Sequence, residues 1–309
     1  MEKSLAIIGG GKTGVNLFKW LKTHGISCRL YCFKGEYANR FRYAELIDQN
    51  ISLDSEVIIT SEKAFSALRD MSCDSFISHY YLRDKKNLES IAKRLNVEAI
   101  RNINISKDDF LFPIIVKPLE SGLTSVPFKF KVVNNMTELK GIDVFLDKCV
   151  VQDYLGDDEY KQVSIAGYFD GTANSLIAVS QDSQYPRGIS AAVYNETEQY
   201  GSIIVRICDV LQSLDFKGFV ECEFKKHRGS DTFYIMDINP RPWGWISFYL
   251  DGFKNPSGVL LENDHVRLEM SKGWVNTPRL LLSVIKGYSS INQLLTALLC
   301  RKKVYEKLF

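Results

Sequence analysis

The sequence predicts an α/β fold at the start of the chain, followed by a strand-rich α+β fold. Short apolar runs alternate with helix-like segments from residue 4 to about residue 104, which is typical of a parallel sheet covered by helices. From about residue 112, apolar runs instead follow one another at the spacing of hairpins. We expect more than one domain in these 309 residues, because single cores stop growing near ~250–300 residues.

The first part opens with an apolar run at residues 4–8, a glycine-rich turn and a helical pattern through Leu21, which predict a strand, a tight turn and a helix. The following segments repeat this alternation, with strands expected at 28–33, 56–60, 75–80 and 97–100 and a helix at 87–95. We expect all of these strands in one parallel sheet within residues 1–104.

The glycine-rich turn, Gly9-Gly10-Gly11-Lys12-Thr13-Gly14, fits the pattern GxGxxG, in which missing side chains let backbone N–H groups approach a phosphate. A dinucleotide-binding unit normally has an acidic residue about 20 residues further on, which binds the ribose. Here the second strand ends Tyr31-Cys32-Phe33-Lys34. We therefore favour a structural turn, keep NAD(P) binding as an alternative, and retain Gly10 and Gly11 as candidate substrate contacts.

The second part contains further strands and a helix before a mostly helical tail. The apolar patterns predict strands at 112–117, 128–133, 149–154, 162–169, 176–180, 220–226 and 233–239, and a helix at 201–214. The apolar helical tail would pack either on its own core or on a second subunit, which leaves a homodimer open.

The composition disfavours nucleic acid and membrane as partners and indicates the cellular compartment. The 39 basic and 37 acidic residues leave a net charge of +2 and are spread along the chain, which disfavours nucleic acid as a partner. Apolar runs shorter than about 18 residues disfavour a membrane span or a signal peptide. The 7 cysteines form no CxxC pair and are interpreted as reduced core thiols. We therefore expect a cytoplasmic protein.

Four segments in the second part carry a family resemblance: FPIIVKP (112–118), VVQDYLGDDEY (150–160), GFVECEFKK (218–226) and YIMDINPRPWG (234–244). In this order they resemble the ATP-grasp superfamily, which includes carboxylate–amine ligases and the large subunit of carbamoyl-phosphate synthase. The resemblance implies an ATP-grasp fold of two α+β lobes after a Rossmann-like pre-ATP-grasp domain. The domains implied are the pre-ATP-grasp domain at 1–104, a lid subdomain at 105–156 and a catalytic subdomain with the helical tail at 157–309.

Three residues of the last two segments form a candidate metal site. Asp237 and Asn239 lie two apart on one strand and so face the same way, while Glu223 lies on the adjoining strand of a hairpin. Mg²⁺ bound to a nucleotide needs a few hard oxygen ligands that leave positions free for phosphate oxygens. The resemblance assigns the same three residues to Mg²⁺, with Mn²⁺ as a substitute.

The resemblance also implies roles around the nucleotide. Lys117 would contact the ATP phosphates, and the planar guanidinium of Arg241 would bind the transferring phosphate or the acyl phosphate. The backbone of Gln152-Asp153-Tyr154-Leu155 would read adenine, and Glu159 would accept the ribose hydroxyls.

The function implied is that of an ATP-dependent carboxylate–amine ligase, acting on a small-molecule acid and amine through an acyl phosphate. The loop Gln184-Tyr185-Pro186-Arg187-Gly188 resembles one in ATP-grasp proteins of surface-polysaccharide pathways, where the arginine faces the substrate. The lid loop at 120–127 contains one glycine and Pro127, which lacks an N–H group. A non-catalytic nucleotide-binding protein therefore remains an alternative.

Overall fold

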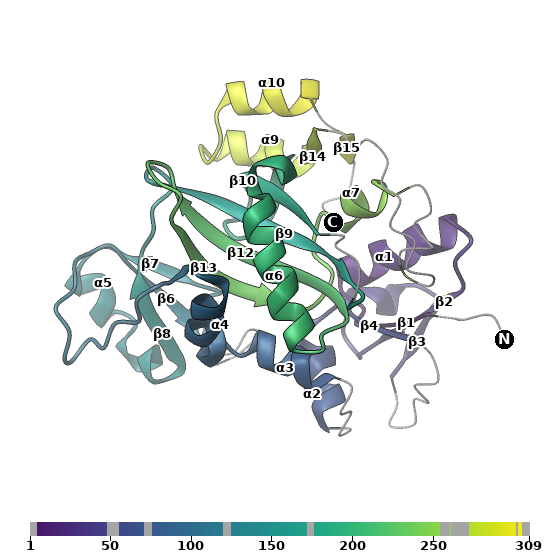
Figure 1. Cartoon of the computed structure of the whole chain (residues 1–309), viewed down its shortest axis with the longest axis horizontal. Coiled ribbons are helices and arrows are strands. Elements are labelled where there is room, and N and C mark those ends of the chain that lie inside the picture. Colours follow the sequence, from purple (N-terminus) through teal and green to yellow (C-terminus); the bar gives the residue numbers. More distant parts are fainter. Residues whose placement is uncertain are drawn as a thin grey trace.

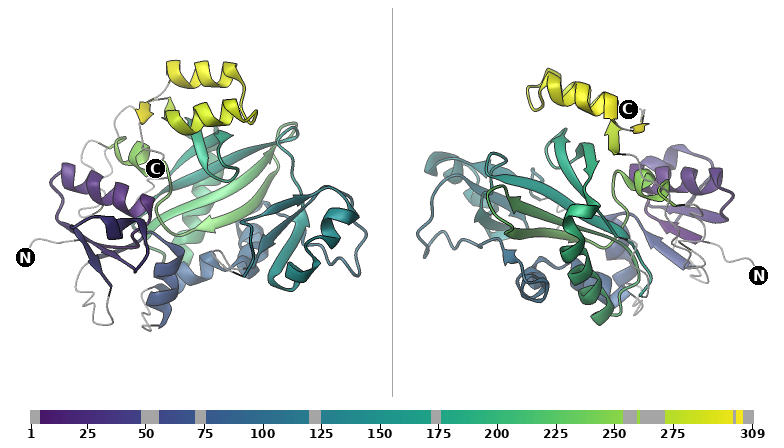
Figure 2. Two further views of the ribbon diagram at one scale, coloured as in Figure 1. Left: turned by 180° about the vertical axis from the view of Figure 1, so that it is seen from behind. Right: turned by 45° about the horizontal axis from the view of Figure 1, so that its top comes forward.

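The computed structural model describes residues 5–47, 56–70, 76–119, 125–171, 176–253, 260, 272–300 and 302–304. Within them the strands form a four-stranded, an eight-stranded and a three-stranded sheet, called here the first, large and small sheets. Figure 1 shows the large sheet in the middle, with the first sheet at one end and the small sheet at the other, and the rear view in Figure 2 agrees.

The first sheet confirms the predicted parallel α/β start of the chain. Its order is β3-β2-β1-β4 and all three pairings are parallel. Each of the four residues of β1 is buried, as expected for a central strand between helices. The elements of this part are β1 (Leu5–Ile8), α1 (Lys12–Thr23), β2 (Cys28–Cys32), β3 (Ala44–Leu46), β4 (Glu56–Ile59) and α2 (Glu62–Asp70).

Two predictions for residues 75–100 are wrong. Residues 77–80 of the segment expected as a strand at 75–80 belong to helix α3 (Ile77–Arg83), and Phe76 precedes that helix as its N-cap, while Ser75 lies outside the described residues. Helix α4 (Leu88–Leu95) is present as expected. The strand after it, β5 (Glu98–Ala99), pairs with β13 of the large sheet and not with the first sheet. The reason is that the apolar face of α4 packs in the core beneath the large sheet and carries the chain there.

The large sheet has the order β15-β14-β11-β10-β9-β12-β13-β5. Helix α6 (Gly201–Ser213) covers one of its faces (Figure 1). The strands expected at 162–169, 176–180, 220–226 and 233–239 are all found. The strands of this sheet besides β5 are β9 (Tyr160–Phe169), β10 (Ile177–Gln184), β11 (Ser190–Asn195), β12 (Gly218–His227), β13 (Phe233–Asn239), β14 (Gly273–Asn276) and β15 (Lys302–Val304).

The small sheet has its own core and consists of β6 (Ile114–Pro118), β7 (Lys131–Val133) and β8 (Cys149–Asp153), with β6 in the middle. Both of its pairings are antiparallel, as the predicted hairpin spacing requires. Helix α5 (Met136–Lys140) follows β7. Residues 120–124 of the predicted lid loop lie outside the described residues.

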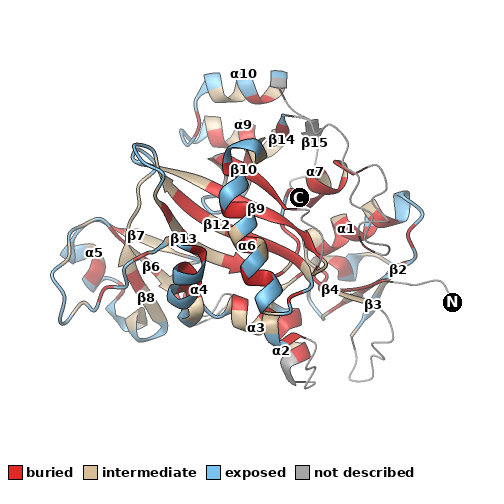
Figure 3. Ribbon diagram, viewed as in Figure 1, coloured by how far each residue is buried: buried red, intermediate tan, exposed pale blue. Residues whose placement is uncertain are grey.

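The tail is less helical than predicted, because strands β14 and β15 complete the edge of the large sheet. Its helices are α7 (Ile246–Leu250), α9 (Thr277–Ile285) and α10 (Ile291–Cys300). Figure 3 shows many exposed positions on α10, whereas α9 is mostly intermediate or buried. Short 3₁₀ helices occupy Tyr37–Arg40, Lys85–Asn87, Asp143–Lys148 and Thr197–Tyr200. In the described part of the chain, no helix has the length and apolarity needed to span a bilayer.

Candidate active site

Strand β12 separates an apolar face of the large sheet from a polar one. Val220 and Cys222 are buried in the core beneath α6. Because side chains alternate along a strand, Glu221, Glu223 and Lys225 lie on the opposite face. Glu221 is only 6% exposed and Lys225 only 8% exposed, so this polar face is itself largely shielded from water.

The pairing of β12 with β13 brings the predicted metal ligands together. Glu223 lies directly opposite Asp237, and Glu221 lies opposite Asn239. Burial and the neighbouring Asp237 carboxylate raise the pKa of Glu223, so bringing these carboxylates together is unfavourable without a cation. Two carboxylates and one amide oxygen are hard donors that fit Mg²⁺ or Mn²⁺. Among the described residues, no group of three or more His, Cys, Asp and Glu side chains could hold a metal ion.

Glu221 is an acidic neighbour of this site that the sequence analysis did not single out. Burial and the charge of Glu223 raise its pKa to about 8, while Arg241 acts in the opposite direction. The signal that was available is the strict alternation Glu221-Cys222-Glu223, which places both carboxylates on one face. The candidate site therefore contains a third acidic side chain, which is mainly protonated near neutral pH because its pKa is raised.

Lys117 reaches the same place from the small sheet. Burial lowers the pKa of this ammonium, with Lys85 acting in the same direction, while Asp237 and Glu223 raise it. The influence of Asp237 and Glu223 on Lys117 means that its ammonium lies within electrostatic reach of the predicted metal ligands. The structure thus brings the predicted phosphate-binding lysine and the predicted metal ligands into one site, and adds Lys85, which the sequence analysis did not name.

Arg241 lies just beyond β13 and is held by three hydrogen bonds. Its Nε donates to Oε1 of Glu62 at 3.0 Å, Nη2 to Oδ1 of Asn239 at 3.3 Å, and Nη1 to the Pro242 carbonyl at 3.3 Å. Glu62 also accepts a hydrogen bond from Nε of Arg83 at 2.5 Å. Glu62 and Arg83 belong to α2 and α3, and no motif in the sequence indicated either of them.

The predicted substrate arginine lies at the edge of the polar face. Arg187 is 3.7 Å from a carboxylate oxygen of Asp157, and Lys225 is 2.5 Å from the other oxygen. Lys129, from the small-sheet side, donates to the carbonyl of Gly188 at 3.1 Å. Glu159, the predicted ribose ligand, is exposed. Asp157 rather than Glu159 therefore makes the contacts between the loop at 184–188 and β12.

The predicted adenine-reading segment begins in β8. Asp153 forms two hydrogen bonds of 2.9 Å with Arg101, and the amide of Gln152 donates to Asn102 at 3.0 Å. These side chains are thus engaged with the chain that leads into the small sheet. The prediction concerned the backbone of this segment, and residues 154–155, just past the strand, are half-buried.

The glycine-rich turn has a structural explanation. The backbone N–H of Gly10 donates to a carboxylate oxygen of Glu36 at 2.6 Å, which places the chain's own anion where a phosphate would bind. A Cβ on Gly14 would lie 2.1 Å from the carbonyl oxygen of Gly9, whereas one on Gly11 would meet nothing within 4 Å. Glycine is therefore required at 14 by close packing and at 9 by a φ of +117°, as the structural-turn interpretation expects.

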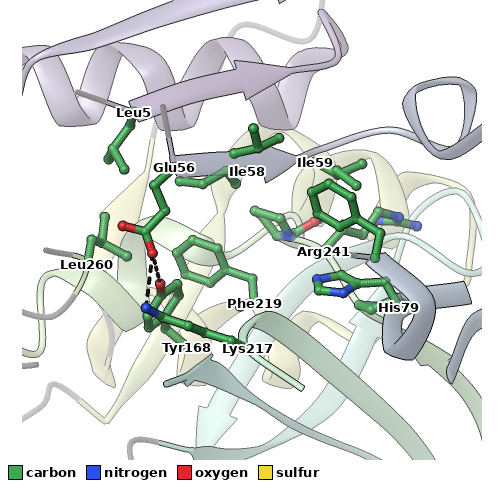
Figure 4. A pocket seen from close by; sticks show the side chains of 15 residues that line it. Leu5, Glu56, Ile58, Ile59, His79, Tyr168, Lys217, Phe219, Arg241 and Leu260 are labelled. Atoms are coloured by element: carbon green, nitrogen blue, oxygen red, sulfur yellow. Dashed lines mark hydrogen bonds and ion pairs between the residues drawn. The ribbon is translucent and has the colours of Figure 1, made fainter. Parts of the chain in front are cut away.

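A cavity of about 260 Å³ lies between β4 and the large sheet, beside the candidate site (Figure 4). On its polar side Glu56 accepts a hydrogen bond from the Tyr168 hydroxyl at 3.0 Å and lies 3.3 Å from Nζ of Lys217. His79 lines another part of the wall, and burial lowers its pKa to about 4. Arg241 also lines the cavity, which places the cavity next to the polar face rather than within it.

Comparison with known proteins gives matches in structure but not in sequence. No protein-family model matches the chain, and no curated protein matches its sequence. N5-carboxyaminoimidazole synthetase from Staphylococcus aureus, complexed with ADP, superimposes with a TM-score of 0.63 at 15% identity, covering 92% of this chain and 85% of that one. L-amino acid ligase from Bacillus licheniformis superimposes with a TM-score of 0.60 at 15% identity, covering 86% of this chain and 75% of that one.

A third structure, N5-carboxyaminoimidazole synthase from Aspergillus clavatus in complex with ADP and 5-aminoimidazole ribonucleotide, gives a TM-score of 0.57 at 11% identity, covering 78% and 70%. At such identities the similarity establishes the fold alone. The chain has the ATP-grasp fold, with the parallel α/β sheet in front of it, as the four sequence motifs implied.

Proposed function

We propose that this protein is an ATP-dependent carboxylate–amine ligase that works through an acyl phosphate, with ADP and phosphate as products. The observation that carries the proposal is that Glu223 and Asp237 pair on the polar face of the large sheet, and that the charges of Lys117 and Arg241 act on Glu223 there. Solved structures with the same fold include an L-amino acid ligase and a synthetase complexed with ADP, which supports the assignment.

The role of each residue in this site follows from the charge that it carries. A divalent cation held by Glu223, Asp237 and Asn239 would neutralise charge on the nucleotide phosphates. Lys117, whose pKa is lowered by burial, would pair with a phosphate oxygen. This attraction would offset the unfavourable free energy of removing its ammonium from water. In the described part of the chain, the guanidinium of Arg241 has two N–H groups beyond its three hydrogen bonds, and these would bind oxygens of the transferring phosphate.

The chemistry needs no nucleophile from the protein. A substrate carboxylate oxygen attacks the γ-phosphorus, and the bond from that phosphorus to the bridging oxygen breaks, so that ADP leaves with the electron pair. The amine nitrogen then attacks the acyl carbon, the carbon–oxygen bond to phosphate breaks, and the nitrogen loses a proton. The site contributes by positioning the reactants and by stabilising the negative charge that moves between oxygens.

The substrates are proposed only by class, as a small-molecule acid and amine. The loop at 184–188 is the basis for including surface-polysaccharide precursors among them. Its Arg187 lies 3.7 Å from Asp157 at the edge of the polar face, where a substrate carboxylate could replace Asp157 as its partner.

The test measures ADP release from purified protein with ATP, Mg²⁺ and pools of candidate acids and amines, for wild type and Asp237→Asn. This change keeps size and removes one charge, so we expect release to fall at least about a hundredfold while the fold survives. Asp231→Asn is the matched control, because Asp231 is 99% exposed in the turn between the same two strands. Titration with Mn²⁺, followed by its electron paramagnetic resonance, should show weaker metal binding for Asp237→Asn only.

Release that requires both an acid and an amine supports ligation, whereas release with an acid alone indicates a kinase. Nucleotide binding without release from any pool indicates a non-catalytic binding protein. Wild-type rates in Asp237→Asn would remove Asp237 from the metal site.

A further inference from the structure

We infer that Glu62, from the first helix after β4, is a positioning residue for Arg241 and so for the phosphate that Arg241 would bind. This inference rests on the proposed function, since it concerns the same site. It adds a residue from the first part of the chain to the predicted metal and phosphate ligands, which all come from the second part.

The geometry is that of one carboxylate shared by two arginines. Oε1 of Glu62 accepts from Nε of Arg241 at 3.0 Å, and Oε2 accepts from Nε of Arg83 at 2.5 Å. The side chains of all three residues are only 25–26% exposed, so water weakens these ion pairs less than it would on an open surface. Each oxygen of the carboxylate thus has its own guanidinium.

The charges around Glu62 keep it ionised. Burial by itself raises the pKa of this carboxyl, but Arg241 and Arg83 more than offset that effect, and the pKa is lowered overall. An ionised carboxylate accepts a stronger hydrogen bond than a neutral one. Glu62 is therefore present in the form that holds a guanidinium best.

The contact determines which donors of Arg241 remain for a ligand. A guanidinium has five N–H groups. Nε is occupied by Glu62, and the terminal nitrogens each donate once, to Asn239 and to the Pro242 carbonyl. Among the described residues, one N–H on each terminal nitrogen has no hydrogen-bond partner, and this pair suits two oxygens of one phosphate. Without Glu62 the guanidinium could rotate, and these two donors would lose their fixed direction.

The chain offers a matched control in Glu56. This carboxylate lies on β4, in the same part of the chain as Glu62, and contacts Tyr168 of the large sheet and Lys217 just before β12 rather than Arg241 (Figure 4). Glu56→Ala therefore removes a contact between the same two parts of the molecule while leaving the candidate arginine in place.

The experiment compares Glu62→Ala, Glu62→Asp and Glu56→Ala with the wild type by two measurements. The first is the Nε–H signal of Arg241 in protein labelled with ¹⁵N-arginine, assigned by its absence from Arg241→Lys. The second is the rate of ADP release under saturating ATP, acid and amine. Backbone amide spectra establish that each variant is folded.

We expect Glu62→Ala to move the Arg241 Nε–H signal and to lower kcat by about tenfold or more, with a change in KM for ATP below about threefold. Glu62→Asp should recover part of the rate, because it restores the charge at a slightly greater distance. Glu56→Ala should leave both the signal and kcat close to the wild type.

An Arg241 signal that does not move in Glu62→Ala overturns the inference. So does a moved signal with a kcat no lower than that of Glu56→Ala, because Glu62 would then only join the two parts of the molecule. Failure of the proposed function is separate from either result. It would appear as a wild type that releases no ADP with any pool, and the Arg241 signal would still show whether Glu62 holds this guanidinium.

Discussion

Acidification should destabilise this protein through His79, a buried histidine on α3. The side chain is 7% exposed and packs against the rings of Phe76 and Phe216, with centroids 5.0 and 4.5 Å away. Its Nδ1 has no hydrogen-bond partner among the described atoms. Burial lowers the pKa of His79 from 6.5 to about 4, because a charged imidazolium would lose its hydration in this apolar setting.

The magnitude follows from the difference between the two pKa values, 6.5 and about 4. At about 1.36 kcal/mol per unit, the shift corresponds to about 3 kcal/mol of unfolding free energy. The unfolded state takes up a proton at a higher pH than the folded state does. This contribution is therefore fully present above pH 6.5 and is lost as the pH falls towards 4, with about 2 kcal/mol gone at pH 5.

The assay is urea unfolding at pH 7.5 and pH 5.0 for the wild type, His79→Leu and His24→Gln. Between pH 7.5 and pH 5.0, the unfolding free energy of His79→Leu should fall by about 2 kcal/mol less than that of the wild type, because the variant has no imidazole to protonate at this position. His24 is exposed, so His24→Gln should keep the wild-type pH dependence. Equal losses in wild type and His79→Leu would refute the reasoning.

Two further predictions concern Lys117 and the glycine turn. Lys117→Met keeps the apolar stem and removes a desolvated charge, so the melting temperature should stay the same or rise. The Kd for Mg-ATP, measured by calorimetry, should increase about tenfold or more. An unchanged Kd would contradict the role of Lys117 in phosphate binding. Gly14→Ala should lower the unfolding free energy by about 3 kcal/mol or prevent folding, since its Cβ would lie 2.1 Å from the Gly9 carbonyl oxygen. Gly11→Ala should lower the unfolding free energy by about 1 kcal/mol at most, because a Cβ at this position has no atom within 4 Å. Equal unfolding free energies in urea for the two alanine variants would show that packing does not explain Gly14.

Local patterns in the sequence were sufficient for most of the architecture. The alternation on β12 and β13 predicted that Glu223, Asp237 and Asn239 share a face, and their pairing in the structure agrees. The parallel first sheet and the hairpins of the small sheet were also predicted, because period-2 and period-3.6 patterns are set by residues close in sequence. The order of the four motifs along the chain was enough to imply the ATP-grasp fold.

Contacts between distant elements could be learned only from the tertiary structure. Glu62 and Arg241 are 179 residues apart and come together because the first sheet packs beside the end of β13. No local pattern distinguishes Glu62 from an ordinary acidic residue in a first helical turn, where such residues are common for electrostatic reasons. The strand predicted at 75–80 and the sheet predicted for the strand at 97–100 were wrong for the same reason, since the packing of both segments is decided by α4, α6 and β13 rather than by their own residues. Sequence periodicity determines which face a side chain takes, whereas packing between elements determines what that face meets.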